Sequence, residues 1–495
     1  MYHLDHTLIE IVSSQERARW NIRHAFEGTQ IFGGIGSGKT SGSGRKLALK
    51  YLGAGFGGLV LTVKPDEKEL WQQYCRQTGR ERDLLILEPG SPHFFNFLEY
   101  EASQSASSLT ENLVEVLRTV IRASDAKDAG RSDDSFWETA LDMLMFNVID
   151  LCKLAYGELS LQDLYDIAQS IPKTKEELQS EENAEKAFQL AMKAANERVN
   201  EQIENWYLTL SAREHIEMED NALFQQKVKQ ALPDARLLSF LDQFFVDTYI
   251  PISEKTRSII DFIFSGCIFR LLREPIYSLF CRGKSTITPE DSQRGKIILI
   301  NLPVKIYHKV GRDCQILFKY LWQRTMEKRR ITPDSRPVFL WADEAQNFLH
   351  EHDADYQATA RSSRIATVYI SQNLPNYYAC MGGQKAEYRV KSFLGTLGTK
   401  IFHANADIET NKYASELFGD AFFEDESEST TYSQNFGKTK SKSLKLERMV
   451  RPEEFVKLRT GGPLNNFQVE GYLHRQGDAL LKGLNQTKMV FNQNS

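Results

Sequence analysis

Residues 31–44 of this 495-residue chain read IFGGIGSGKTSGSG, and they set the fold class. The run Gly33-x-x-x-x-Gly38-Lys39-Thr40 matches a glycine-rich turn in which successive backbone N–H groups point inward around phosphate oxygens. We expect the ammonium group of Lys39 to reach the β- and γ-phosphates and the hydroxyl of Thr40 to bind Mg²⁺. The pattern therefore predicts an ATP site, and its nucleotide-binding residues are Gly33, Gly34, Ile35, Gly36, Ser37, Gly38, Lys39, Thr40 and Ser41.

The helix expected after this turn contains Gly42 and Gly44. A glycine in a helix interior costs about 1 kcal/mol relative to alanine, so two of them need a reason. We expect both to allow a close approach between this helix and a strand, where a side chain would collide. The glycines thus predict tight packing directly behind the phosphate-binding turn.

Around the turn, strand-like and helix-like stretches alternate, which predicts a mainly parallel α/β sheet with helices on both faces. The alternation spans residues 1–104, stops over 105–290 and resumes over 291–423, so we interpret 105–290 as an inserted all-α domain in one nucleotide-binding domain. Residues 424–448 are polar and are expected to be a flexible segment. Residues 449–495 are expected to be a C-terminal tail with one strand that packs on the nucleotide domain.

A second motif, an acidic pair, completes the predicted site. Asp343 and Glu344 follow an apolar run, 338–342, and would lie at the carboxyl edge of the sheet. There Asp343 can join Thr40 in holding Mg²⁺, and Glu344 can orient and deprotonate the attacking water. Gln372 ends the next apolar run and would sense the γ-phosphate, which favours a RecA-like P-loop ATPase. The alternative is an acidic pair that only caps a helix.

The overall charge argues against a protein whose whole surface carries positive charge for nucleic-acid binding. Its 61 Lys and Arg residues against 66 Asp and Glu residues give a formal net charge of -5, so any DNA contact must be local. Lys385, Arg389 and Lys391 follow Tyr377 and Tyr378, a mixture that suits contact with a DNA backbone. The alternative is a solvated helix face. We also expect no intrinsic membrane segment, because no run of 18 apolar residues occurs.

Six segments, in this order and spacing, resemble the type IV secretion and conjugation coupling proteins, the TraG/TraD-type ATPases related to the FtsK and HerA DNA pumps. They are GSGKTSGSG at 36–44, VKPD at 63–66, SFWE at 135–138, LWADEAQ at 340–346, ISQN at 370–373 and LGTKIF at 397–402. The resemblance extends from about residue 19 to about residue 471 and includes the helical insertion.

This resemblance implies a homo-hexameric ring that hydrolyses ATP with Mg²⁺ and drives DNA, or a DNA–protein substrate, through a central pore. Arg361 and Arg364 precede the strand that ends at Gln372, and by position Arg361 matches the family's arginine finger while Gln372 matches its sensor. Secretion couplers usually begin with transmembrane helices, which this sequence does not show. We therefore expect a cytoplasmic protein whose membrane association, if any, comes through partners.

Three functions stay open at this stage. The first is DNA translocation by the ring, in conjugation or secretion. The second is a cytosolic ring ATPase that recruits or gates a partner such as a relaxase, a nuclease or an effector, for example in anti-phage defence, without moving DNA. Its partner surface would then be the polar helical stretch 173–230. The third is a monomeric nucleotide-binding protein with slow hydrolysis.

Overall fold

The computed structural model describes residues 2–12, 16–104, 110–125, 135–350, 352–381, 386–431 and 437–494. The chain divides into two compact units. Unit 1 comprises residues 1–86, 289–315 and 321–495, and unit 2 comprises 87–288 with 316–320. We expected the insertion to begin at residue 105. It begins earlier, because residues 87–104 also belong to the helical unit.

Unit 1 is built on one large sheet, whose strands in the described residues follow the order β13-β12-β9-β3-β8-β7-β4-β6-β5. The pairs β3–β8, β3–β9, β7–β8, β4–β7 and β4–β6 are parallel, whereas β12 runs antiparallel to both β9 and β13. The strands are β3 (Thr29–Phe32), β4 (Gly57–Leu61), β5 (Leu84–Leu87), β6 (Ile297–Ile300), β7 (Val338–Ala342), β8 (Ile365–Ser371), β9 (Thr399–His403), β12 (Gln468–Arg475) and β13 (Gln486–Asn492).

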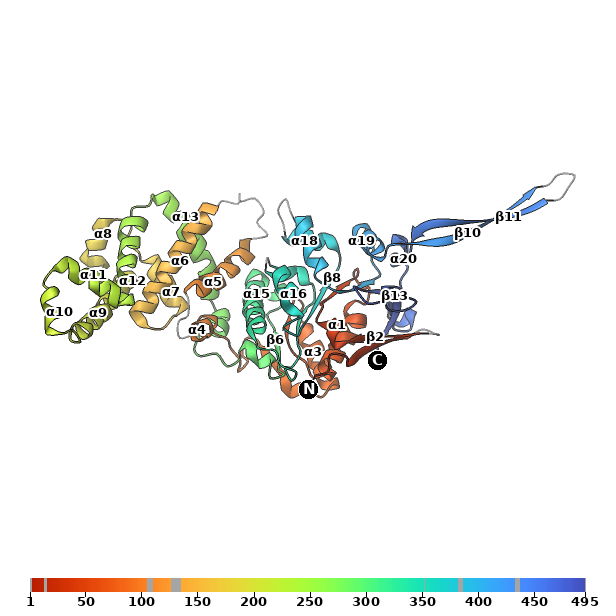
Figure 1. Cartoon of the computed structure of the whole chain (residues 1–495), viewed down its shortest axis with the longest axis horizontal. Helices are drawn as coiled ribbons and strands as arrows, with labels where there is room; N and C mark the ends of the chain where they lie inside the picture. Colours follow the sequence, from red (N-terminus) through yellow and green to blue (C-terminus); the bar gives the residue numbers. More distant parts are fainter. Residues whose placement is uncertain are drawn as a thin grey trace. The chain divides into compact units, whose positions relative to one another are not determined.

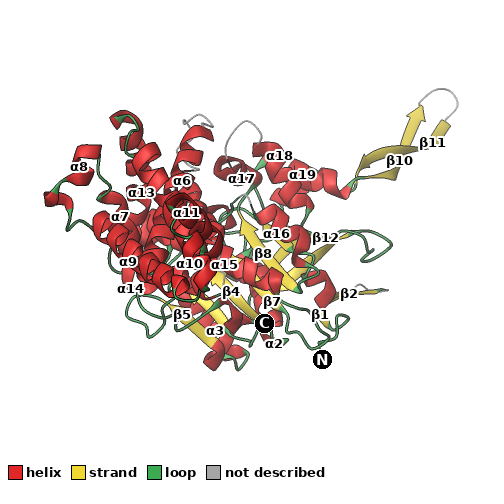
Figure 2. Cartoon of the chain, turned by 60° about the vertical axis from the view of Figure 1, so that its left-hand side comes forward, coloured by secondary structure: helices red, strands yellow, loops and turns green. Residues whose placement is uncertain are grey.

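Helices cover both faces of this sheet, which confirms the predicted α/β class (Figure 2). On one face Phe339 and Trp341 pack against Tyr51 and Trp71. On the other, Tyr369 packs against Phe393. Double coverage explains why β3, β4, β6, β7, β8 and β9 consist of buried residues throughout. The helices of unit 1 are α1 (Ile22–Ala25), α2 (Arg45–Gly53), α3 (Glu67–Gln77), α15 (Val304–Lys328), of which 316–320 count with unit 2, α16 (Asp353–Ala360), α17 (Leu374–Met381), α18 (Ala386–Gly395), α19 (Ile408–Phe418) and α20 (Pro452–Val456).

Unit 2 consists of helices, as expected for the insertion, and is drawn from orange to green in Figure 1. Its core is formed by apolar side chains such as Leu144, Val148, Phe188 and Phe245, which are fully or almost fully buried. The helices are α4 (Phe97–Ser103), α5 (Thr110–Asp125), α6 (Ser135–Tyr156), α7 (Leu161–Gln169), α8 (Lys175–Gln179), α9 (Ala187–Tyr207), α10 (Ala212–Glu217), α11 (Asn221–Ala231), α12 (Pro233–Gln243), α13 (Glu254–Leu271) and α14 (Ile276–Phe280).

Two parts of unit 1 differ from the sequence-based expectation. The polar segment 424–448 lies mostly in a hairpin, β10 (Asp420–Thr431) with β11 (Gly437–Arg448), whose register pairs acidic with basic positions such as Asp420 with Arg448. The C-terminal tail supplies two strands, β12 and β13, and extends the sheet. Composition alone could not predict the β10–β11 hairpin or the second strand of the tail, because each depends on strand pairing between residues that are not adjacent in the sequence. A short N-terminal hairpin, β1 (Thr7–Val12) with β2 (Arg17–Asn21), completes the described strands.

Candidate functional site

The glycine-rich turn leaves the central strand β3 and leads into a wide helical turn, Thr40–Gly44, before α2. Gly36 and Gly38 have φ values of +72° and +80°, a region that favours glycine. The hydroxyl of Ser37 is buried and has no hydrogen-bond partner among the described residues. An orphaned buried donor beside a turn of backbone N–H groups fits an anion such as a nucleotide phosphate.

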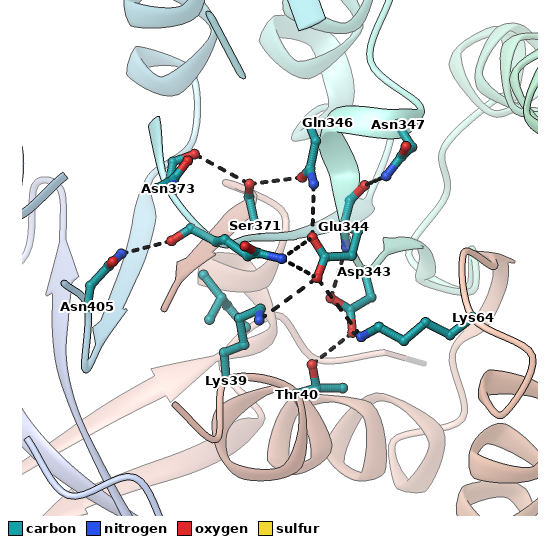
Figure 3. A network of polar contacts seen from close by, with 12 residues as sticks. Lys39, Thr40, Lys64, Asp343, Glu344, Gln346, Asn347, Ser371, Asn373 and Asn405 are labelled. Atoms are coloured by element: carbon teal, nitrogen blue, oxygen red, sulfur yellow. Dashed lines mark hydrogen bonds and ion pairs between the residues drawn. The ribbon is translucent and has the colours of Figure 1, made fainter. Parts of the chain in front are cut away.

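The acidic pair lies at the carboxyl end of β7, next to this turn. The hydroxyl of Thr40 donates a hydrogen bond to Asp343 Oδ2 at 2.8 Å (Figure 3). Lys64 Nζ, from the loop after β4, is 3.9 Å from Asp343 Oδ2 and 3.9 Å from Glu344 Oε1. Burial raises the pKa of Asp343, and Lys64 opposes that shift. Two oxygen ligands with a neighbouring carboxylate suit Mg²⁺, which prefers oxygen donors.

Glu344 is the most constrained of the predicted catalytic residues. It is buried and has a φ of 51°. Its carboxylate accepts hydrogen bonds from Gln346 Nε2 at 2.9 Å and from Gln372 Nε2 at 3.3 and 3.4 Å, and Lys39 Nζ lies 3.9 Å away. The structure therefore brings Lys39, Glu344 and Gln372 together, and the two amides hold the carboxylate in one orientation. Figure 3 shows Lys39 and Gln346 on either side of the Glu344 carboxylate.

Several polar residues that support this cluster had no role assigned from the sequence. Ser371 Oγ donates to Gln346 Oε1 at 2.9 Å, and Asn405 Nδ2 donates to the carbonyl of Gln372 at 2.8 Å. Both lie at the carboxyl ends of strands that flank β3, and that position was the available signal. Glu67 of α3 accepts a hydrogen bond from the backbone N–H of Val63 at 2.8 Å, and burial and then the charge of Asp343 raise its pKa to about 8.

A cavity of about 630 Å³ opens beside the turn. Its lining includes Tyr74 of α3 and the C-terminal residues Gln493 and Asn494. Gln493 Nε2 donates to Ser41 Oγ at 2.6 Å, and Arg45 Nη1 donates to the carbonyl of Gln493 at 2.8 Å. The end of the chain thus contacts the glycine-rich turn, which no local pattern could indicate.

The arginine candidates lie away from this cluster. Arg361, at the end of α16, has a 70% exposed side chain whose Nη1 lies 3.6 Å from Glu27 Oε1. Arg364 instead donates to the carbonyls of Pro333 and Ser335 at 3.1 and 3.0 Å. Arg361 therefore presents its guanidinium to solvent, whereas Arg364 is engaged in a turn.

The DNA candidates are only partly described. Arg389 and Lys391 are exposed on α18, and Lys391 forms an ion pair with Glu387 one turn earlier, which is typical of a solvated helix face. Lys385 lies outside the described residues. Tyr377 is buried and donates to Gln30 Oε1 at 2.8 Å, so its side chain is not exposed beside these basic residues.

Gly42, just after the phosphate-binding turn, packs directly on strand β12. A Cβ at Gly42 would lie 3.1 Å from Cβ and Cγ1 of Val469, in β12. We expect Gly42→Leu to lower the free energy of unfolding by about 1–3 kcal/mol through overpacking, and Val469→Ala to restore part of the loss in the double variant. Denaturant unfolding measures both. Gly53→Leu is the control, since no atom lies within 4 Å of its added Cβ, and an equal effect there would contradict the packing argument.

His403 links the same helix to β12. A carbonyl can only accept, so Nδ1–H donates to the Glu470 carbonyl at 2.8 Å and Nε2 accepts from the Ser43 hydroxyl at 2.7 Å. Burial lowers the pKa of His403 to about 4 from 6.5. As the pH falls, His403 of the unfolded chain takes up a proton near pH 6.5, whereas His403 of the folded chain does so only near pH 4. The free energy of unfolding therefore decreases between pH 6.5 and pH 4, by about 3 kcal/mol for this group. We expect His403→Gln to flatten the pH dependence of unfolding by that amount, and parallel curves would contradict the assignment.

Fold and site together define a class. Strand β3 leads into the glycine-rich turn, Asp343 and Glu344 directly follow β7, and Gln372 directly follows β8, which lies between β3 and β7. This arrangement is that of a RecA-like P-loop NTPase fold with an all-α insertion.

Comparisons with known proteins match one segment of the chain to a family and most of the chain to solved structures. Residues 337–460 match the family described as "TraM recognition site of TraD and TraG". The structure resembles the bacterial conjugative coupling protein TrwBdeltaN70 in its unbound form, with a TM-score of 0.59, 14% identity, and coverage of 98% of this chain and 90% of that chain. No curated protein sequence matches the chain. One segment of the chain thus matches this family, and the chain shares the fold of a conjugative coupling protein.

Two further structures of TrwB carry nucleotide. The complex with ADP and Mg²⁺ gives a TM-score of 0.58 at 13% identity and covers 96% of this chain and 87% of that chain. The complex with the non-hydrolysable ATP analogue ADPNP gives 0.57 at 14% identity, with 96% and 88% covered. Among the described residues, none of the helices has both the length and the apolar composition that a membrane span requires.

Proposed function

We propose that this protein is an ATPase that binds ATP with Mg²⁺ and hydrolyses it. The observation that carries the proposal is the buried cluster in which Thr40 contacts Asp343 while Lys39 and Gln372 contact Glu344. The unpartnered hydroxyl of Ser37 and the cavity beside the turn fit a nucleotide. The TrwB complexes with ADP and Mg²⁺ and with an ATP analogue support the same substrate class.

Each residue of the cluster receives a role in this proposal. The backbone N–H groups of the turn and the ammonium of Lys39 hold phosphate oxygens, and oxygens of Thr40 and Asp343 hold the metal ion. Bound Mg²⁺ supplies positive charge that stabilises the negative charge developing on the phosphate oxygens. Glu344 accepts the proton of the attacking water, and Gln346 and Gln372 keep its carboxylate aimed.

We further propose that the chain works as a motor in a homo-hexameric ring and moves DNA, or a DNA–protein substrate, through the central pore. The fold of the coupling proteins supports this, and so does the exposed side chain of Arg361, which could exchange its contact with Glu27 for the active site of a neighbouring copy and act there as an arginine finger. Lys385, Arg389 and Lys391 stay the candidate DNA contacts.

The decisive experiment measures ATP turnover by the full chain with and without DNA, next to sedimentation in ATP and Mg²⁺. A motor is expected to form a ring and to raise its turnover several-fold when DNA is added. Unstimulated turnover in a confirmed ring would contradict translocation and favour a ring that recruits or gates a partner. Sedimentation as a monomer under every condition would contradict the ring.

A protein partner is part of the proposal because the matched family segment is described as a site where TraD and TraG recognise TraM. We infer that a partner of the relaxase, nuclease or effector kind binds the surface of residues 337–460. Partner binding should then survive removal of the polar helical stretch 173–230. Loss of binding on that deletion, with ATP turnover intact, would instead place the partner surface on unit 2.

A further inference from the structure

The hairpin β10–β11 is a two-stranded sheet that projects from unit 1 (Figures 1 and 2). Its register runs through twelve pairs, from Asp420 opposite Arg448 to Thr431 opposite Gly437. Strands of this length extend for about 40 Å. In the described part of the chain no third strand pairs with either edge, so each edge presents a row of backbone N–H and C=O groups.

Such a hairpin is at most marginally stable alone, since two strands without a third strand or a covering helix bury too little surface. One face of the hairpin also carries exposed apolar side chains. Phe422 lies opposite Leu446, and Leu444 follows on the same face opposite Glu424. Phe422, Leu444 and Leu446 are 60–70% exposed. Both the edges and this face favour a further strand.

The two edges carry opposite charge. Strand β10, DAFFEDESESTT, contains five acidic residues and no basic one. Strand β11, GKTKSKSLKLER, contains five basic residues and one acidic residue. Two β10 edges, or two β11 edges, would repel each other, whereas a β10 edge attracts a β11 edge. The complementary surface for one edge of this hairpin is therefore the other edge of the same hairpin in a second copy.

We propose that the β11 edge of one copy of this chain pairs with the β10 edge of a second copy, and this inference deepens the proposed self-association on which it rests. Parallel hairpins in neighbouring copies place these strands antiparallel, so the ladder continues across the contact. The contact is heterologous and can repeat from copy to copy, as a ring requires.

The test uses charge reversal in the full chain. Lys442→Glu with Lys445→Glu removes the net positive charge of β11 and makes positions 442, 445 and 447 all acidic. It is expected to weaken self-association, measured by sedimentation velocity, by about tenfold or more. This variant also breaks the ion pairs of Lys442 with Glu424 and of Lys445 with Asp425 inside the hairpin. Adding Glu424→Lys and Asp425→Lys restores those pairs with reversed sign and should restore assembly.

The four-residue variant then separates the hairpin contact from a structural effect. Positions 442, 445 and 447 of its β11 are acidic and repel the acidic Glu424 and Asp425 of wild-type β10, so differently labelled wild-type and variant chains are expected to assemble separately. Mixed assemblies of the wild-type and four-residue variant chains would overturn the hairpin proposal, and so would unchanged sedimentation of the Lys442→Glu/Lys445→Glu chain. Neither result would contradict the proposed ring. A wild-type chain that stays monomeric with ATP, Mg²⁺ and DNA would overturn both proposals.

Discussion

Glu344→Gln is expected to lower ATP turnover by about 10²–10⁴-fold while nucleotide binding is retained. Glutamine has nearly the shape of glutamate and can still contact Gln346, but its amide cannot accept the proton of the attacking water. The measurement pairs steady-state phosphate release with equilibrium binding of ATP in Mg²⁺. The effect should therefore appear in kcat and not in affinity.

A matched control for this variant is Glu10→Gln, which removes an exposed carboxylate on β1 in the same unit. It should leave turnover and binding unchanged. If Glu344→Gln keeps more than about a tenth of wild-type turnover, another group activates the water and the proposed role of Glu344 is wrong. If the variant also loses binding, Glu344 acts through the structure of the site, because its carboxylate lies 3.9 Å from Lys39 Nζ.

Lys39→Met is the second change with a large expected effect. It keeps most of the buried stem and removes the ammonium group, which is buried beside the glycine-rich turn. Loss of one partner of a buried, charge-assisted contact costs about 2–5 kcal/mol, which corresponds to at least about a 30-fold weaker binding of ATP. Titration of the nucleotide in the presence of Mg²⁺ measures the change, and turnover should fall with it.

Lys50→Met provides the comparison, because Lys50 is exposed on α2 and has the same charge and stem length. Its affinity for ATP should equal that of the wild type. Equal losses in the two variants would mean that the overall positive charge of this helix attracts the nucleotide. Unchanged binding in Lys39→Met would refute the proposed phosphate contact of Lys39.

Much of the site follows from short-range sequence. Gly33 to Thr40 are covalently adjacent, so their spacing alone places N–H groups, ammonium and hydroxyl around one point. Asp343 and Glu344 reach the same point because parallel strands bring their carboxyl ends to one edge of the sheet. Gln372 was predicted by the same rule. Gln346 and Asn405 obey that rule too, but without the strand order nothing singled them out among other polar loop residues.

Contacts between distant residues were decided by the tertiary structure. Gly42 predicted a close neighbour, and the fold supplies Val469 of β12, more than 400 positions later. Gln493 contacts Ser41 because β13 returns beside the turn. Most of the polar residues 424–448 pair into the strands β10 and β11. The chemistry of the glycine-rich turn follows from the spacing of residues along the chain. The contacts of Val469 and Gln493 depend instead on which strands become neighbours in the sheet. That strand order is determined by the free energy of packing the whole sheet.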